Sequence, residues 1–311
     1  MASLAFLTYG LTAISLCFFT GVFWLSWVLS LKYVPIFRTY TRTEQANWCS
    51  RIGSTLHATV ICFGMLYSLS VQSWDSNLHP LHSVDLARAF FSWSIAYFIY
   101  DLVVVVTWKV PLWQVFTVHH FVAMLPFAIF NFYRGNCSAD TYLLSVYLLV
   151  ELCVLPMNAA AFLEDLGYGD TKLHLIVSYF MYGSWVIVRG LLPIYALYVL
   201  WAILIPSLDF HVTETWICAG PAIVCGHLIS CFCVGCLIFV ITPAFMTRLR
   251  QKPGSSMDDL HDNTSLVAIR RVSTYGTITL NTPRYCQDYS MPSASYKSPI
   301  TTLALWSYPR I

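Results

Sequence analysis

The stretch FTVHHFVAML, residues 116–125, places two adjacent histidines, His119 and His120, in a segment otherwise apolar enough to cross a bilayer. A neutral imidazole in hydrocarbon carries a donor and an acceptor, and each is costly without a partner. Consecutive helical residues point about 100° apart, so the two rings would face two different neighbours. Ionisable residues inside a membrane span mark a candidate functional site. The alternative is that both rings only hold neighbouring helices together.

The composition of the 311 residues is that of a membrane protein. Hydrophobic residues make up 58% of the chain and charged residues 10%, against about 45–50% and about 25% in soluble domains. Long apolar runs recur from end to end, so the sequence predicts an all-α, multi-pass transmembrane helical bundle. The net charge of +2 is too small to indicate a nucleic-acid partner.

Apolar windows of about 20 residues mark helices that can cross the hydrocarbon core. The sequence contains about seven of them. They cover Thr8–Leu31, Ile52–Gln72, Ala89–Trp108, Val115–Tyr133, Thr141–Leu163, His174–Leu200 and Trp216–Ile241. Pro193 lies inside the sixth, which predicts a tilt, a kink or an end in a lumenal half-turn there.

Basic residues are distributed unevenly between the two sets of connections. One set carries Lys32, Arg38, Arg42, Arg51, Lys109, Lys172, Arg248, Arg250 and Lys252, and the other only Arg88 and Arg134. Lys and Arg concentrate in cytosolic connections. We therefore expect a lumenal or external N-terminus and a cytosolic C-terminus, with the endoplasmic reticulum as the expected membrane.

Three regions differ in composition. Residues 1–44 hold the first span and a cytosolic loop, residues 45–245 a transmembrane domain, and residues 246–311 a tail rich in Ser, Thr and Pro that we expect to be disordered. Within this tail, Ser273 follows two arginines and is similar to a site for a basic-directed kinase. We expect the sequons at Asn136, close to the membrane, and at Asn263, in the cytosol, to be unused.

The eleven cysteines are scattered, mostly inside apolar segments, where cysteine acts as a small hydrophobic residue. Cys231, Cys233 and Cys236 have the spacing C-x-C-x-x-C, which could indicate a metal site. On a helix, however, Cys231 points away from the other two, and no histidine nearby completes the set. We therefore expect packing and no metal.

Polar side chains fall into two layers when depth is counted at about 1.5 Å per helical residue. The first layer lies roughly 6–10 Å from the cytosolic face and contains His57, Asp101, His119, His120 and Asn158. The second contains Glu151 and Arg189, roughly 18–22 Å deep. Because an unpaired charge at that depth is expensive, we expect these two residues to pair or to line a wet cavity. We expect the first layer to line one cavity open toward the cytosol.

Several of these residues also carry a family resemblance. The chain resembles the TLC-domain family, which includes the ceramide synthases, and most of all its branch called "family with sequence similarity 57". The matching pieces are Trp48-Cys49-Ser50-Arg51 with Ser54 and His57, Tyr97-Phe98-Ile99-Tyr100-Asp101, His119-His120, Glu151-Leu152 with Asn158, and Val188-Arg189. They follow one another in the family's order across about residues 45–245.

The resemblance implies that His119 and His120 match the catalytic pair proposed for ceramide synthases. Those enzymes also have an aspartate-rich His-Asp-x-Ser-Asp run in the next span, where this chain has a single acid, Glu151. Only Asp101 and Glu151 remain to orient an imidazole. The resemblance thus implies a lipid-handling TLC fold more firmly than it implies acyl transfer.

Two functions from different classes follow. In the first, the protein binds or processes acyl lipids in a polar cavity lined by His57, Glu151, Asn158 and Arg189, and so influences lipid homeostasis. In the second, it is an N-acyltransferase that joins acyl-CoA to a sphingoid base, with His119, His120 and Asp101 as the catalytic residues.

We expect membrane lipids as partners, acyl-CoA and a sphingoid base as substrates in the second case, and no cofactor; a homodimer is left open. A transporter is a third alternative, but the sequence shows no inverted repeat.

Overall fold

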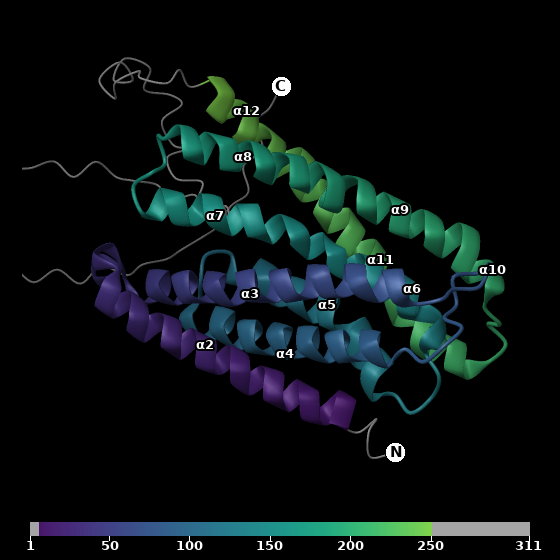
Figure 1. Ribbon diagram of the computed structural model, residues 1–311. Helices are drawn as coiled ribbons and strands as arrows, with labels where there is room; N and C mark the ends of the chain where they lie inside the picture. The colour runs from purple at the N-terminus through teal and green to yellow at the C-terminus, as the bar shows by residue number, and fades with distance from the viewer. Residues whose placement is uncertain (1–5, 251–311) are drawn as a thin grey trace, which may run out of the picture.

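The computed structural model describes residues 6–250, and these form a bundle of seven helices long and apolar enough to cross a membrane (Figure 1). The first four spans are nearly continuous helices. They are α2 (Leu11–Tyr33), α3 (Arg42–Val71), α4 (Asp85–Trp108) and α5 (Trp113–Phe132), with a π turn at Phe6–Gly10 before α2 and a 3-10 turn at Pro35–Thr39 before α3.

The last three spans are each built from several helical pieces. The fifth joins a 3-10 turn at Ser138–Asp140, α6 (Thr141–Leu148), a 3-10 segment at Leu149–Cys153 and α7 (Val154–Asp165). The sixth joins α8 (Lys172–Ser184), a π segment at Trp185–Leu191, α9 (Leu192–Val199), a π segment at Leu200–Leu204 and α10 (Ile205–Ser207). The seventh joins α11 (Thr213–Cys236), a π segment at Leu237–Ile241 and α12 (Thr242–Arg250).

Prolines account for the irregular segments of the sixth and seventh spans. Each of the three π segments ends two residues before a proline, at Pro193, Pro206 and Pro243. A proline has no N–H to donate, and its ring clashes with the carbonyl one turn earlier. A local π turn accommodates that defect while the helix continues. The sixth span therefore keeps its course past Pro193 instead of ending there.

The seven expected spans are confirmed, but three of them are longer than the sequence indicated. The second begins at Arg42, ten residues before Ile52. The sixth continues beyond Leu200 to Ser207, and the seventh continues beyond Ile241 to Leu249. The tail expected from residue 246 thus begins inside a helix, because α12 is polar but still helical through Arg250. The rest of the expected tail, with Ser273 and Asn263, lies outside the described residues.

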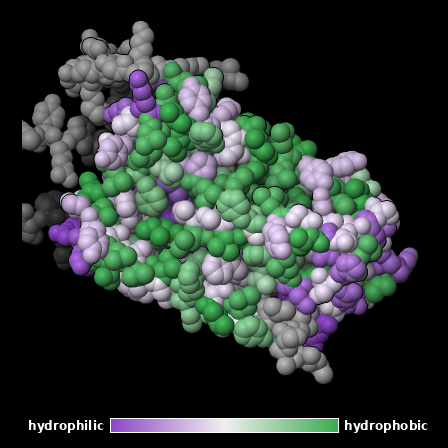
Figure 2. All heavy atoms as spheres, in the orientation of Figure 1, coloured by the Kyte–Doolittle hydropathy of each residue, from purple (hydrophilic) through white to green (hydrophobic). Residues whose placement is uncertain are grey.

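The surface carries a broad apolar belt, and hydrophilic residues gather toward the two ends of the bundle (Figure 2). Large aromatic side chains in the spans are exposed to an unusual degree, for example Phe180 at 69% and Phe239 at 79%. Exposure of that kind is costly in water and neutral in hydrocarbon. The belt therefore faces lipid.

Helix α4 packs against α2, α3 and α5, and these four helices share one apolar core around Phe19, Phe91 and Ile95. The start of α3 is fixed by a capping box, in which Thr41 Oγ1 accepts from the backbone N–H of Glu44 and the Glu44 carboxylate accepts from that of Thr41. Such reciprocal caps satisfy backbone donors that a helix end leaves unpaired. The cap sets where the polar face of α3 begins.

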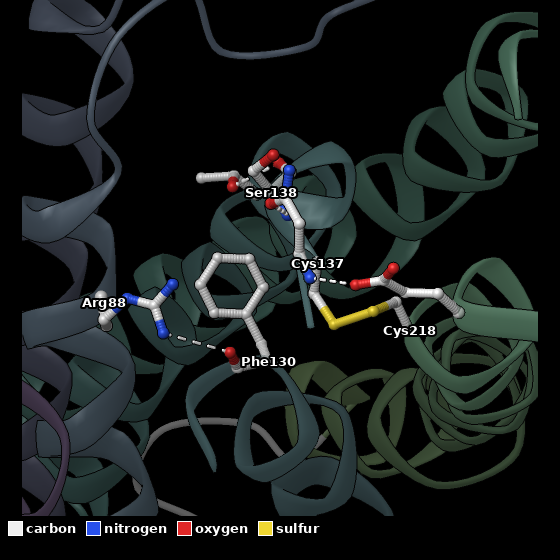
Figure 3. Close-up of a disulfide and its surroundings, with 8 residues drawn as sticks. Arg88, Phe130, Cys137, Ser138 and Cys218 are labelled. Carbon is white, nitrogen blue, oxygen red and sulfur yellow. Dashed lines mark hydrogen bonds between the residues drawn. A yellow bond between two sulfur atoms is a disulfide. The ribbon is translucent and has the colours of Figure 1, made fainter. Parts of the chain in front are cut away.

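A disulfide joins Cys137, just before α6, to Cys218 in the first turns of α11 (Figure 3). The two residues are 81 positions apart, and their Cα atoms lie 5.2 Å apart. Beside this bond, the backbone N–H of Asn136 donates to the Glu214 carboxylate of α11. The interpretation of the cysteines as packing residues is wrong for this pair. The available signal was that Cys137 lies in a short connection and not in an apolar run.

Arg88 lies near the disulfide at the same end of the bundle (Figure 3). Its guanidinium donates to the carbonyl of Phe130 over 3.3 Å and lies over the Phe130 ring, 5.1 Å from the centroid. Both contacts join the start of α4 to the end of α5. We call this end of the molecule the disulfide end and the opposite end, which carries α12, the basic end.

Candidate functional site

Asp101 and His120 form a buried pair between α4 and α5. Asp101 lies two turns before the end of α4, and His120 lies two turns after the start of α5. Because the connection between these helices is short, the two positions are brought to the same depth. His120 Nε2 is 3.5 Å from Asp101 Oδ2, and each side chain is 7% exposed. A carboxylate in this position can orient an imidazole and fix its tautomer.

Ser50 of α3 holds the other oxygen of the same carboxylate. Its hydroxyl donates to Asp101 Oδ1 over 2.5 Å. Ser50 lies in the third turn of α3, which begins at the capping box. Ser50 could not be given a role from the sequence, because depth alone does not reveal that it faces α4. Asp101 is thus held between α3 and α5.

One ring nitrogen of each histidine, Nδ1, is buried. Within residues 6–250, neither His119 Nδ1 nor His120 Nδ1 has a hydrogen-bond partner. His119 stacks on Phe232 of α11 with the ring centroids 5.2 Å apart, while His120 faces α4. The two rings therefore point to different neighbours, as expected from their adjacency on a helix. A buried nitrogen without a partner is costly, and both Nδ1 atoms are therefore free to bind a ligand.

His57 belongs to a different contact. Its Nε2 lies 3.2 Å from the hydroxyl of Ser94, and its ring stacks on Tyr97 with a centroid distance of 3.9 Å. The side chain is fully buried and packs near Phe19 of α2. His57 thus fastens α3 to α4 and α2.

Asn158 of α7 is hydrogen-bonded to α3. Its amide nitrogen donates to the Arg51 carbonyl and to the hydroxyls of Ser54 and Thr55, over 2.7–3.1 Å. From the expected layer, the structure brings Asp101 and His120 into direct contact, beside His119. The rings of His57 and His120 both contact the ring of Phe98, each with a centroid distance of 5.7 Å. His57 and Asn158 lie at a similar depth to His120, but their hydrogen bonds go to other residues.

Glu151 and Arg189 form the deeper pair, as expected from their depth and charge. Arg189 Nη2 lies 3.6 Å from Glu151 Oε1, and both side chains are nearly buried. The guanidinium also donates through Nε to the Val150 carbonyl over 3.3 Å and lies 4.8 Å from the centre of the Trp185 ring. These contacts connect the fifth and sixth spans. The predicted pairing is confirmed.

A second ion pair was not expected from the sequence. Arg51 Nη1 lies 2.6 Å from Asp165 Oδ2, at the basic end of the bundle. It joins α3 to the end of α7, where Tyr40 also donates to the Asp165 carbonyl over 3.0 Å. These contacts fix α3 beside α7 within about two turns of Ser50.

The three cysteines of α11 do not converge on one point. Cys233 is completely buried, whereas Cys231 is exposed on the lipid-facing surface. In the part of the chain that the structure describes, no three His, Cys, Asp or Glu side chains are grouped so that they could hold a metal ion.

A family model described as the TLC domain matches residues 47–247. The chain belongs to the TLC-domain family. No curated protein and no solved structure matches it. A TLC domain on seven apolar helices makes this a multi-pass membrane protein of lipid metabolism or homeostasis.

The matched TLC domain begins in α3 and ends in α12, so it contains both partners of the Ser50–Asp101, Asp101–His120 and Glu151–Arg189 contacts. Helix α2 lies before it but is part of the same core. Phe19 of α2 stacks on Tyr100 with a centroid distance of 5.8 Å and contacts the ring of His57. The first span thus supports the α3–α4 side of the TLC domain.

Proposed function

We propose that the protein binds an acyl lipid in the bundle and processes it at His120, as an acyltransferase of the ceramide synthase type. The single observation that supports this is the arrangement Ser50–Asp101–His120. A histidine held by a carboxylate, which is itself held by a third group, is the arrangement that activates a general base. The second nitrogen of this histidine is buried and has no protein partner within residues 6–250.

The chemistry follows from which nitrogen is held. With ionised Asp101 accepting from Nε2–H, the lone pair of His120 is on Nδ1. As the amine of a long-chain base attacks the thioester carbon of acyl-CoA, Nδ1 takes the amine proton. The C–N bond forms, the C–S bond breaks, and the proton passes to the departing thiolate. Asp101 stabilises the transient imidazolium, and we propose His119 as the donor to the developing oxyanion.

The Nε2–Oδ2 distance of 3.5 Å is longer than that of a formed hydrogen bond. Catalytic hydrogen bonds are often long in empty sites and shorten when substrate binds. We expect the same here.

The position of the pair suits acyl-CoA. Asp101 lies seven residues before the last residue of α4, which is roughly 10 Å from the basic end. That end carries most of the Lys and Arg residues in the connections. Cations attract the phosphates of CoA, and an acyl chain would extend from there into the bundle.

We infer in addition that the basic end faces the cytosol and that the membrane is that of the endoplasmic reticulum. Two independent observations support this orientation. Nine basic residues flank one side against two on the other, and Lys and Arg concentrate on the cytosolic side. The disulfide lies at the opposite end, and disulfides persist in the oxidising lumen or outside the cell.

A tag after Ile311 tests the orientation. In intact microsomes the tag should be removed by added protease, while the Cys137–Cys218 bond stays intact on a non-reducing gel. A tag that is cleaved only after the membrane is permeabilised contradicts the proposed orientation.

One observation favours a non-catalytic lipid-binding protein as the second candidate. Glu151 stands where the ceramide synthases have their aspartate-rich run, and it is neutralised by Arg189. It therefore supplies no second free carboxylate. In this case the same bundle would hold a lipid without converting it.

Labelled acyl-CoA and sphingoid base, given to microsomes, distinguish the two candidates. The variant His119→Ala/His120→Ala should lose at least about 10²-fold in turnover, the usual lower contribution of a general base. His227→Ala is the matched control and should keep full turnover, because His227 is bonded to Trp201 and Ile223, outside the site.

Equal turnover in the double variant and the wild type would contradict the assignment of His120. Absence of turnover in the wild type, with bound lipid that changes in the double variant, would establish the non-catalytic candidate.

A further inference from the structure

A hollow on the side of the molecule is separate from the histidines and opens toward the membrane. It lies between α3, the fifth span and the sixth span, and has a cavity volume of about 330 Å³. Its walls include Leu66 of α3, Leu149 and Leu152 of the fifth span, and Leu191, Leu192 and Tyr195 of the sixth. We call it the lateral groove. None of the histidines lines it.

The lateral groove occupies one half of the membrane. Its lining on the sixth span runs from Ile187 to Tyr195, and eight helical residues rise about 12 Å. Half of the hydrocarbon core is about 15 Å thick. Leu66 lies five residues before the end of α3, so the groove begins near the disulfide end and reaches about as far as the level of Arg189. Its length therefore fits a ligand in a single leaflet.

The walls of the lateral groove offer no charge. Its lining contains no Lys, Arg, Asp or Glu. Glu151 and Arg189 are next in sequence to the wall residues Leu152 and Val188, but they are buried and paired with each other. A phospholipid headgroup would therefore find neither a cation for its phosphate nor an anion for its amine here.

One polar feature stands at the disulfide end of the groove. The hydroxyl of Tyr195 lies 2.8 Å from the hydroxyl of Tyr142, the second residue of α6. Two phenols that share one hydrogen bond keep a second O–H and further lone pairs for another partner. Tyr195 is 43% exposed, so this capacity is accessible from the groove. The ring of Trp74 contacts Tyr142 edge-on, and Trp and Tyr gather at the membrane–water interface.

We propose that the lateral groove is a binding site for a membrane sterol, whose hydroxyl bonds the Tyr142–Tyr195 pair and whose ring system lies against the leucines. A sterol combines a rigid apolar body with one hydroxyl at one end, which is the complement of this lining. Rigidity lowers the entropy lost on binding, an advantage over a flexible acyl chain.

The space for the alkyl tail continues beyond the groove. A neighbouring pocket with a cavity volume of about 420 Å³ shares Leu152, Ile187 and Val188 with it and extends along α8 to Tyr179. The tail of a sterol anchored at Tyr195 points in this direction. The sterol site and the acyl-lipid proposal rest on different residues, and neither depends on the other.

Labelling with a photoactivatable sterol in membranes that contain the full chain tests the proposal. We expect saturable labelling of peptides from α3 and α9, displaced by excess unlabelled cholesterol. Tyr195→Phe should reduce labelling about 5- to 10-fold, as expected for the loss of one hydrogen bond. Leu66→Trp, which fills the groove from a half-exposed, lipid-facing position, should abolish it.

Matched controls come from the same lipid-facing surface. Tyr198→Phe on α9 and Leu228→Trp on α11 make the same changes at exposed positions outside the groove, so labelling should equal that of the wild type. Folding of each variant is checked by the presence of the Cys137–Cys218 bond on a non-reducing gel and by its elution profile in size-exclusion chromatography. If Leu66→Trp fails these checks, Tyr142→Phe replaces it, with the effect expected for Tyr195→Phe.

Labelling that cholesterol does not displace, or that stays the same in Tyr195→Phe and in the groove-filling variant, overturns the proposal. So does a phospholipid with a photoactivatable acyl chain that labels α3 and α9 while the sterol probe does not. That result would assign the groove to an acyl chain.

Discussion

Replacing Arg189 by leucine should lower the free energy of unfolding by about 3–5 kcal/mol, because Glu151 would then keep a buried charge without a partner. The variant also loses the bond to the Val150 carbonyl. The double variant Arg189→Leu/Glu151→Leu should recover most of this loss, since no charge remains buried. Denaturant-induced unfolding of the purified protein in detergent measures both values.

Arg38→Leu is the control for loss of an arginine as such. Arg38 is exposed and donates to the carbonyls of Leu31 and Lys32 at the end of α2. Its loss should cost less than about 1 kcal/mol, as for other cations at exposed helix ends. If the single and double variants at Arg189 and Glu151 are equally unstable, the cost comes from packing and not from the unpaired charge.

The variant Asp101→Asn should retain the shape of the site and lose about 10²–10⁴-fold in kcat, the range that general base catalysis supplies. An amide can donate to His120 as well as accept from it, so the tautomer is no longer fixed. KM for acyl-CoA should change little, because Asp101 contacts His120 and Ser50 and not the substrate. Turnover of labelled acyl-CoA over a range of substrate concentrations separates the two constants.

Two further variants complete that test. Ser50→Ala removes one hydrogen bond to Asp101 and should reduce kcat by roughly 10-fold, which corresponds to about 1.4 kcal/mol. Asp165→Asn is the matched control, because Asp165 is bonded to Arg51 at the basic end, outside the site. Full turnover in Asp101→Asn would show that the carboxylate does not act through His120.

The sequence was sufficient for the spans and for the depth of each polar residue. Apolar windows of about 20 residues correspond to the thickness of the hydrocarbon core, so all seven spans could be predicted. The rise of a helix is constant, so equal depth and opposite charge were enough to pair Glu151 with Arg189. Asp101 and His120 were placed at similar depths for the same reason.

Depth does not determine the face of a helix that a residue occupies. His57 and Asn158 have the depth of His120, but His57 faces Ser94 and Tyr97, and Asn158 faces Ser54 and Thr55 of α3. That rotation depends on how the helices pack. In the sixth span, the π segments before Pro193 and Pro206 also change which way the following side chains face, because each turn of π helix holds more residues than a turn of α-helix.

The bond between Cys137 and Cys218 orders the events of biogenesis. In the proposed orientation, Cys137 enters the lumen once the fourth span is inserted, whereas Cys218 arrives only with the seventh. Cys218 comes 81 residues after Cys137, and this stretch takes roughly 4–16 s to synthesise at about 5–20 residues per second. During that interval Cys137 is an unpaired thiol, open to capture by glutathione or by another nascent chain. The disulfide can therefore form only after the fifth and sixth spans have been inserted into the membrane. The fraction of chains that carry it measures how many chains complete insertion.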